Sequence, residues 1–166
     1  YYPYSAACTI TAVGNSVAVT TPASVSSRAA GYPFGLAYNA NDAKHVLDIA
    51  NSTGYAYVLT MSSGSISVGT EASYSPGFTA RNSLCVYDSS AQKIVRGYNS
   101  TSDPRPVEFA VASISGTDVT FGTAVTCFAG NGNIQTQGTF DSNKNQLAFF
   151  NLTFATTSLE TNFGTV

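Results

Sequence analysis

Alternating apolar and polar residues predict a meander of β-strands over residues 118–155. Within it, Asn131-Gly132 is typical of a type I′ hairpin turn, which needs a positive φ at both central positions. A turn there places Cys127 opposite Thr136, and opposed residues of an antiparallel pair share a face. Phe128 then falls on the polar face as an exception. The apolar face collects Val125, Cys127, Ala129, Ile134 and Phe140, and a shift of one residue would scatter them.

The next strand, expected over residues 146–155, contains the N-glycosylation sequon Asn151-Leu152-Thr153. A glycan must point into solvent, and side chains alternate between the two faces of a strand. An occupied sequon therefore predicts which side chains are buried. We expect Asn151, Thr153 and Phe149 to face solvent, and Phe150, Leu152 and Phe154 to face the core.

Short strands of this kind recur along the whole chain, and we expect about ten to twelve of them at spacings of roughly 8–12 residues. The turns between them are predicted at Gly14-Asn15, at Ser62-Ser63-Gly64 and at residues 89–92, with a long loop over residues 22–35. Further strands are expected over residues 8–13, 16–21, 55–61, 65–70, 84–88, 93–98, 107–112 and 159–166. The pattern predicts one all-β domain over residues 1–166, an antiparallel β-sandwich or barrel of roughly ten short strands.

Residues 41–50 are the segment where a helix competes with this pattern. Ala43, Val46, Leu47 and Ala50 recur at i, i+3, i+4 and i+7, behind an Asn-Asp start that resembles a helix cap. The same residues alternate poorly as a strand. We therefore expect at most one short helix, at residues 41–50.

Charged residues make up only 10% of the chain, against about a quarter in an average protein. Ten Tyr and ten Phe indicate a folded chain, because disordered segments have few aromatics and high charge. The net charge is −2 and the seven Lys and Arg are dispersed, which disfavours nucleic-acid binding. No apolar run approaches the roughly 18 residues that a membrane span needs, so none is expected.

The chain begins at Tyr1 rather than Met, and we expect a processed form from which a signal peptide has been removed. The charge-poor, Trp-free composition resembles that of small secreted proteins of filamentous fungi. That resemblance covers no specific motif and implies a cell-wall protein or a secreted effector. Sequons at Asn51, Asn99 and Asn151 also favour an extracellular, N-glycosylated protein.

Three cysteines, Cys8, Cys85 and Cys127, match no zinc or redox spacing. In an oxidising compartment we expect one disulfide and one leftover thiol. Strand alternation places Cys8 and Cys127 on inward faces, which favours a Cys8–Cys127 disulfide, with Cys85–Cys127 as the alternative. The leftover Cys85 is then either a small buried side chain or a link to a second chain in a dimer.

No catalytic or cofactor motif stands out, and we expect neither a metal nor a cofactor. His45 is the only histidine, with Asp42 and Asp48 three residues to either side, a spacing that on a helix resembles half of an acid–base relay. The alternative is a solvated turn in which these residues pair weakly. A glycosidase would need two carboxylates about 5–10 Å apart. The candidates for such a pair are Glu71, Glu108, Asp88 and Asp118.

Three functions remain open. The first is a secreted, non-enzymatic β-protein that acts at a cell surface or wall, as a structural component or an effector with a protein partner. The second is a lectin-like module that stacks glycan rings on exposed tyrosines. The third is a hydrolase that uses His45 or a carboxylate pair. The stacking candidates are Tyr2, Tyr4, Tyr32, Tyr38 and Tyr74. For Tyr2 and Tyr4 the alternative is an N-terminal arm that packs along a sheet.

Overall fold

The computed structural model describes residues 5–26, 34–51, 53–62, 64–74, 80–100, 106–129, 137–152 and 159–164. These residues form seventeen β-strands and no helix, so the predicted all-β class is confirmed. Each of the described strand pairs is antiparallel, and the sheets do not close into a barrel.

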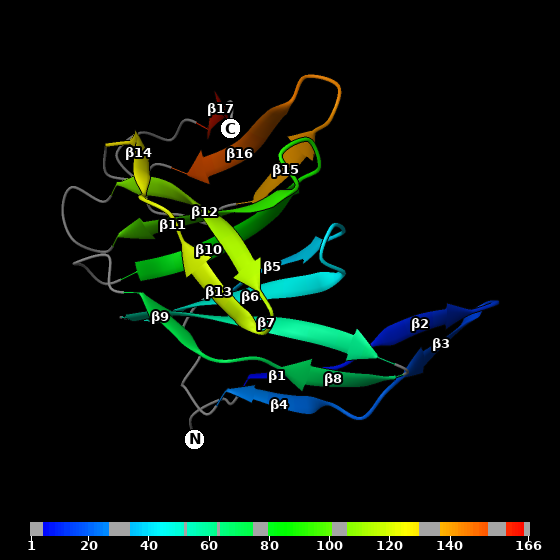
Figure 1. Cartoon of the computed structure of the whole chain (residues 1–166). Coiled ribbons are helices and arrows are strands. Elements are labelled where there is room, and N and C mark those ends of the chain that lie inside the picture. The colour runs from blue at the N-terminus through cyan, green and yellow to red at the C-terminus, as the bar shows by residue number, and fades with distance from the viewer. Residues whose placement is uncertain are drawn as a thin grey trace.

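Two five-stranded sheets form the centre of the fold (Figure 1). The first has the order β5 (Phe34–Asn39), β6 (Lys44–Asn51), β7 (Thr53–Ser62) and β8 (Ser65–Val68), with β9 (Ala72–Tyr74) also paired to β7. The second has the order β10 (Ala80–Asp88), β11 (Lys93–Ser100), β12 (Val107–Ser115) and β13 (Asp118–Phe121), with β14 (Val125–Phe128) also paired to β12.

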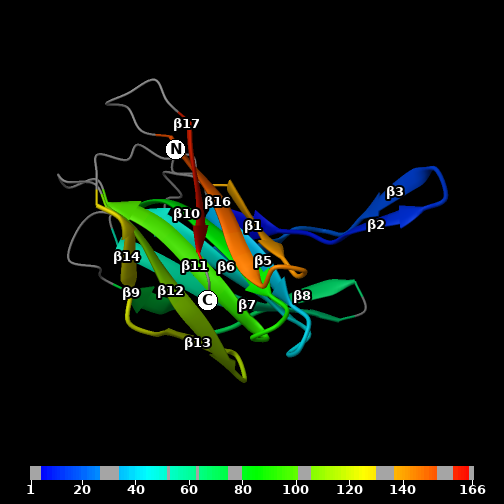
Figure 2. The same ribbon diagram turned by 90° about the horizontal axis from the view of Figure 1, so that it is seen from above.

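Smaller sheets accompany these two. A three-stranded sheet contains β15 (Gln137–Asp141), β16 (Gln146–Leu152) and β17 (Leu159–Gly164). Near the N-terminus, β1 (Ser5–Ala7) pairs with β4 (Ala23–Ser26), and β2 (Ile10–Val13) pairs with β3 (Ser16–Val19). The β2–β3 hairpin projects away from the rest of the molecule in both views (Figures 1 and 2).

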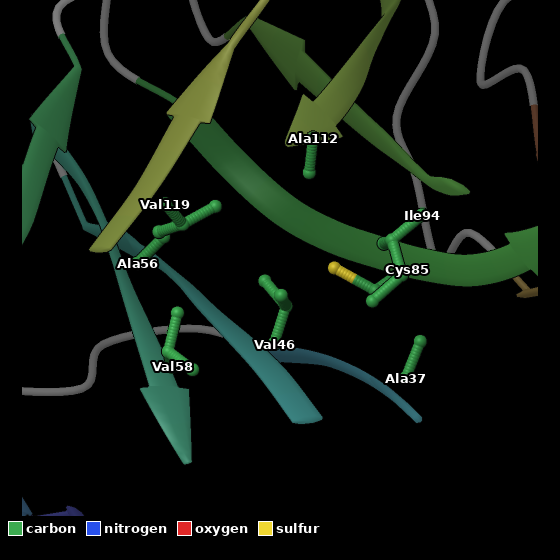
Figure 3. Packing of buried hydrophobic residues seen from close by; sticks show 8 residues of the cluster. All are labelled: Ala37, Val46, Ala56, Val58, Cys85, Ile94, Ala112 and Val119. Carbon is green, nitrogen blue, oxygen red and sulfur yellow. The ribbon is translucent and has the colours of Figure 1, made fainter. Parts of the chain in front are cut away.

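Three hydrophobic clusters hold the layers together. The first lies between the two five-stranded sheets, and the Cys85 sulfur points into it (Figure 3). The second joins β10, β11 and β12 to β16, and the third joins β6 and β7 to β4. The first cluster contains Ala37, Val46, Ala56, Val58, Cys85, Ile94, Ala112 and Val119. Both five-stranded sheets are therefore covered on two faces.

This layering explains why the predicted helix at residues 41–50 was wrong. Val46 lies in the first cluster, whereas Leu47 and Ile49 lie in the third. A strand buried on both faces has no polar alternation, so its apolar run resembles a helical stripe. The Asn-Asp start belongs to the β5–β6 turn, in which Ala43 has a φ of 53°.

The hairpin predicted about Asn131-Gly132 also proved wrong in its pairing. β14 pairs with β12, and β15 pairs with β16 in another sheet; the turn itself lies outside the described residues. On β14, Val125 is 67% exposed, whereas Phe128 packs against the second cluster. A strand of four residues is too short for alternation to specify its inward face, and the larger aromatic is the side chain that is partly buried here.

The face assigned to β16 needs the same correction, because Phe149 is 2% exposed and lies beside Leu147 in the second cluster. The side chains of residues 150–152 are outside the description. Three hairpins were predicted correctly: β2–β3 about Gly14-Asn15, β7–β8 before Gly64, and β10–β11 about residues 89–92. The expected closing strand is β17.

Candidate functional site

A buried ion pair joins the two five-stranded sheets. Arg96 Nε on β11 lies 3.5 Å from Asp48 Oδ2 on β6, and the two side chains are 2% and 0% exposed. The Tyr74 hydroxyl donates a 2.8 Å hydrogen bond to Asp48 Oδ1. The Arg96 guanidinium lies 3.5, 4.1 and 4.5 Å from the ring centroids of Tyr74, Tyr98 and Phe121. We call these five side chains the ion-pair centre.

The electrostatics of the ion-pair centre follow from its burial. Burial raises the pKa of Asp48, and the neighbouring Arg96 charge opposes that rise. Burial also raises the pKa of the Cys85 thiol, which keeps it protonated and poorly nucleophilic. Because the charged groups are almost wholly enclosed, they offer no surface to a substrate. We therefore assign the centre to the packing of the two sheets.

The tyrosines predicted to stack on glycans lie in different surroundings. The ring of Tyr74 belongs to the ion-pair centre, so the prediction that it stacks on a glycan is wrong. Tyr38 is 47% exposed, with its ring centroid 4.8 Å from that of His45. Tyr2, Tyr4 and Tyr32 lie outside the described residues.

His45 does not form the acid–base arrangement that the sequence suggested. It lies three residues from Asp48 on a strand rather than a helix, so the two side chains point to opposite faces. Asp42 instead accepts a 2.8 Å hydrogen bond from the Asn39 amide. Burial lowers the pKa of His45, and its Nδ1 has no hydrogen-bond partner in the described part of the chain.

Three of the four candidate carboxylates accept hydrogen bonds from different partners, and the fourth is exposed. Glu108 accepts a 2.6 Å hydrogen bond from the Tyr98 hydroxyl, and Glu71 accepts one from the Tyr57 hydroxyl. Asp88 accepts bonds of 2.8 and 2.9 Å from backbone N–H groups of its own turn, and Asp118 is exposed at the start of β13. Within the described ranges, no group of three His, Cys, Asp or Glu could hold a metal ion.

The predicted disulfide is absent, because all three cysteines are free. Cys8 precedes the projecting β2–β3 hairpin, whereas Cys127 is on β14 at the opposite side of the molecule (Figures 1 and 2). Cys85 is buried between the sheets, and Cys127 is exposed. Strand alternation misplaced Cys8 and Cys127 because their neighbours Ile10 and Val125, expected to face inward, are 66% and 67% exposed.

The three sequons also differ in their surroundings. Asn99 is 1% exposed on β11, between β10 and β12, which leaves no room for a glycan in the folded protein. Asn51 and Asn151 lie near the ends of β6 and β16, and their side chains are outside the description. Alternation alone could not reveal the burial of Asn99, because β11 is covered on both faces.

An apolar groove of about 470 Å³ lies beside β14. Phe109 and Phe149 contribute neighbouring rings to its lining, with centroids 4.7 Å apart. Val95, Val111, Val125 and Leu147 are the aliphatic residues of the lining, and Thr123, Thr126 and Cys127 are its polar residues. Its volume falls within the range of about 300–1,000 Å³ that is usual for ligand sites. Sequence reasoning missed this groove because β12, β14 and β16 meet only in the folded chain.

The β2–β3 arm, residues 10–19, carries a second apolar surface. Its register pairs Ile10 with Val19 and Ala12 with Val17, so these four side chains share one face. Ile10, Val17 and Val19 are 66%, 67% and 61% exposed. At its base, Thr9 N donates a 3.0 Å hydrogen bond to Thr20 Oγ1, and Thr20 N donates a 3.1 Å bond to Thr9 O. The arm therefore continues a hydrogen-bonded ladder away from the body.

Comparisons with protein-family models, curated proteins and solved structures find no match to this chain. In the described part of the chain there is no helix of the length and hydrophobicity that a membrane span requires.

Proposed function

We propose that this chain is a secreted, non-enzymatic β-protein that acts by binding at a cell surface or wall. The observation that carries the proposal is the β2–β3 arm, which exposes three large aliphatic side chains on one uncharged face. Leaving such a side chain in water forgoes about 1.5–3 kcal/mol relative to burying it. Contiguous exposed apolar surface commonly marks an interaction site.

The edges of the arm support the same proposal. Exposed edge strands are usually protected by charged residues, proline or a bulge, because their free backbone groups attract other strands. The chain from residue 1 to residue 27 carries no charged side chain, and β2 and β3 pair without a shift in register. An arm without these protections is suited to contact a partner.

Retention on cell walls tests this function. The protein would be produced through a secretory host and incubated with isolated cell walls, intact or stripped of protein by protease. We expect Ile10→Asp to reduce retention at least five-fold, because it places a carboxylate on the apolar face of the arm. Thr11→Asp is the matched control, since Thr11 is exposed on the opposite face. Equal retention of the two variants would contradict a role for the apolar face.

A lectin-like module is the second candidate, and the exposed Tyr38 ring beside His45 favours it. Exposed tyrosines provide an apolar face for a sugar ring and a hydroxyl for its polar edge. Pull-downs on chitin, β-glucan, mannan and cellulose would compare the protein with Tyr38→Ala. Retention that is competed by soluble sugar and lost in Tyr38→Ala would favour this candidate over the arm.

A further inference from the structure

The two apolar surfaces lie on opposite sides of the molecule. The β2–β3 arm and β14, which borders the apolar groove, are widely separated in both views (Figures 1 and 2). The arm projects from the body and is hydrogen-bonded at its base, whereas the groove is a hollow beside β14. An arm held in this way cannot fold back into the groove of its own chain.

The geometry points to head-to-tail self-assembly, in which the β2–β3 arm of one copy inserts into the apolar groove of the next. Ile10, Val17 and Val19 would contact the groove beside Val125, Phe109 and Phe149. A contact between two different surfaces does not close on itself as a two-fold dimer does, and its repetition gives rings or open filaments. Because the surfaces lie on opposite sides, successive copies extend outward in a row.

Charge favours a second copy as the occupant of the groove. None of the groove-lining side chains is charged. The arm carries no charged side chain either, since residues 1–27 contain none. A partner with a charged contact surface would have to desolvate its charges against apolar walls, whereas the arm has no charge to desolvate.

The cysteines provide an independent observation. Cys8 lies two residues before Ile10 at the base of the arm, and Cys127 lines the groove. Within one chain they are on opposite sides of the molecule, but arm insertion brings Cys8 of one copy towards Cys127 of the next. Glutathione disulfide can then join them by exchange. Two thiols become one intermolecular disulfide, while their two hydrogens and two electrons convert the oxidant into two glutathione thiols.

Sedimentation velocity under reducing conditions tests the assembly. We expect the protein to form species whose size grows with concentration, and Val17→Asp and Val125→Asp each to remain monomeric. Both residues are 67% exposed, so both variants should keep their fold, which circular dichroism would verify. Thr11→Asp, on the opposite face of the arm, should assemble as the original chain does. A monomeric original chain at every concentration would overturn the inference.

Mixing the two variants distinguishes this mode from its alternatives. Val17→Asp keeps an intact groove and Val125→Asp keeps an intact arm, so an equimolar mixture should form a one-to-one complex and nothing larger. If arms paired with arms instead, Val125→Asp alone would assemble, and that result would overturn insertion into the groove. Failure of the mixture to associate would overturn it as well.

Cross-linking checks the orientation of the arm. With glutathione disulfide, we expect a ladder of covalent oligomers in non-reducing gels, and peptide mapping of mixed isotope-labelled chains should join Cys8 to Cys127 across copies. Cys8→Ser should abolish the ladder, whereas Cys85→Ser should leave it unchanged, because Cys85 is buried. Assembly without the Cys8–Cys127 link would overturn this orientation.

This inference rests on the proposed binding function and specifies one partner for it. The two can fail separately. If the purified protein is monomeric but cell walls still retain it through Ile10, self-assembly is refuted and the proposed function is supported. If the protein assembles but cell walls do not retain it, surface binding is refuted and self-assembly is supported.

Discussion

The ion-pair centre buries charged side chains, whereas the β2–β3 arm exposes apolar ones. Both regions depart from the usual distribution of residues in a folded protein. Between the sheets, Arg96 and Asp48 are almost wholly buried, whereas Val17 at the end of the arm is 67% exposed. Both buried charges have partners inside the chain. Asp48 accepts a hydrogen bond from a tyrosine hydroxyl, and the Arg96 guanidinium lies over three aromatic rings. The arm's apolar side chains Ile10, Val17 and Val19 instead stay mostly exposed. Charged residues that are buried with intramolecular partners serve the fold, and apolar residues that stay exposed remain available for binding.

The largest expected effect comes from removing one charge of the buried pair. Asp48→Asn leaves Arg96 as an uncompensated buried cation, which typically costs about 3–5 kcal/mol of unfolding free energy. Urea denaturation at pH 7 would measure the loss. The double variant Asp48→Leu/Arg96→Met is the control, and we expect it to be more stable than Asp48→Asn because no charge remains buried. A loss below about 1 kcal/mol would mean that water solvates the pair.

A smaller effect is expected from Gly54→Ala on β7. A Cβ at this position would lie 1.8 Å from Tyr74 Cζ, so the Tyr74 ring must leave its place in the ion-pair centre. Overpacking of this kind costs about 1–3 kcal/mol. The matched control is Gly122→Ala, where a Cβ would meet only the Val111 carbonyl oxygen at 3.8 Å. Equal melting temperatures for the two variants would contradict the tight packing described.

Removing only the Tyr74 hydroxyl should have a still smaller effect. Tyr74→Phe keeps the ring over Arg96 but deletes the 2.8 Å hydrogen bond to Asp48. Hydrogen bonds to charged groups contribute about 1.5–3 kcal/mol, and we expect the lower end because Arg96 still compensates the carboxylate. Denaturant titration measures the loss, with Tyr38→Phe, whose ring is half exposed, as the comparison.

Stability should depend weakly on pH through His45. Burial lowers the pKa of His45 below its ordinary 6.5, so just below pH 6.5 the unfolded chain binds a proton that the folded protein does not. The free energy of unfolding therefore falls as the pH falls through this range. Between pH 7 and pH 5.5 the original chain should lose more stability than His45→Gln. Parallel losses would show that His45 is not the source.

The arm should contribute least to stability. Val17→Thr keeps the β-branched shape and changes only a solvent-exposed side chain, so we expect a change within about 0.5 kcal/mol. The same substitution should still weaken self-assembly, because it puts a hydroxyl into the proposed interface. A large loss of stability would mean that the arm packs against its own chain.

The sequence predicted those features that depend on neighbouring residues. The Gly14-Asn15 hairpin was predictable because its turn and both strands lie within ten residues. The segment containing Val46 and Leu47 was not, because burial on both faces of a strand imitates a helical stripe. The ion-pair centre joins Asp48 to Arg96 across two sheets, and no local pattern encodes such a contact. The apolar groove likewise depends on packing between distant strands.

The position of Asp48 also bears on the order in which the protein folds. Most strand pairs join neighbours in the chain, such as β5–β6 and β6–β7, and pairs of this kind close quickly because their loops are short. The first five-stranded sheet can therefore pair while the chain is half synthesised. Its central carboxylate, however, has no cation until β11 has been made. We therefore expect docking of the second sheet, rather than strand pairing, to be the slow step in the folding of the nascent chain.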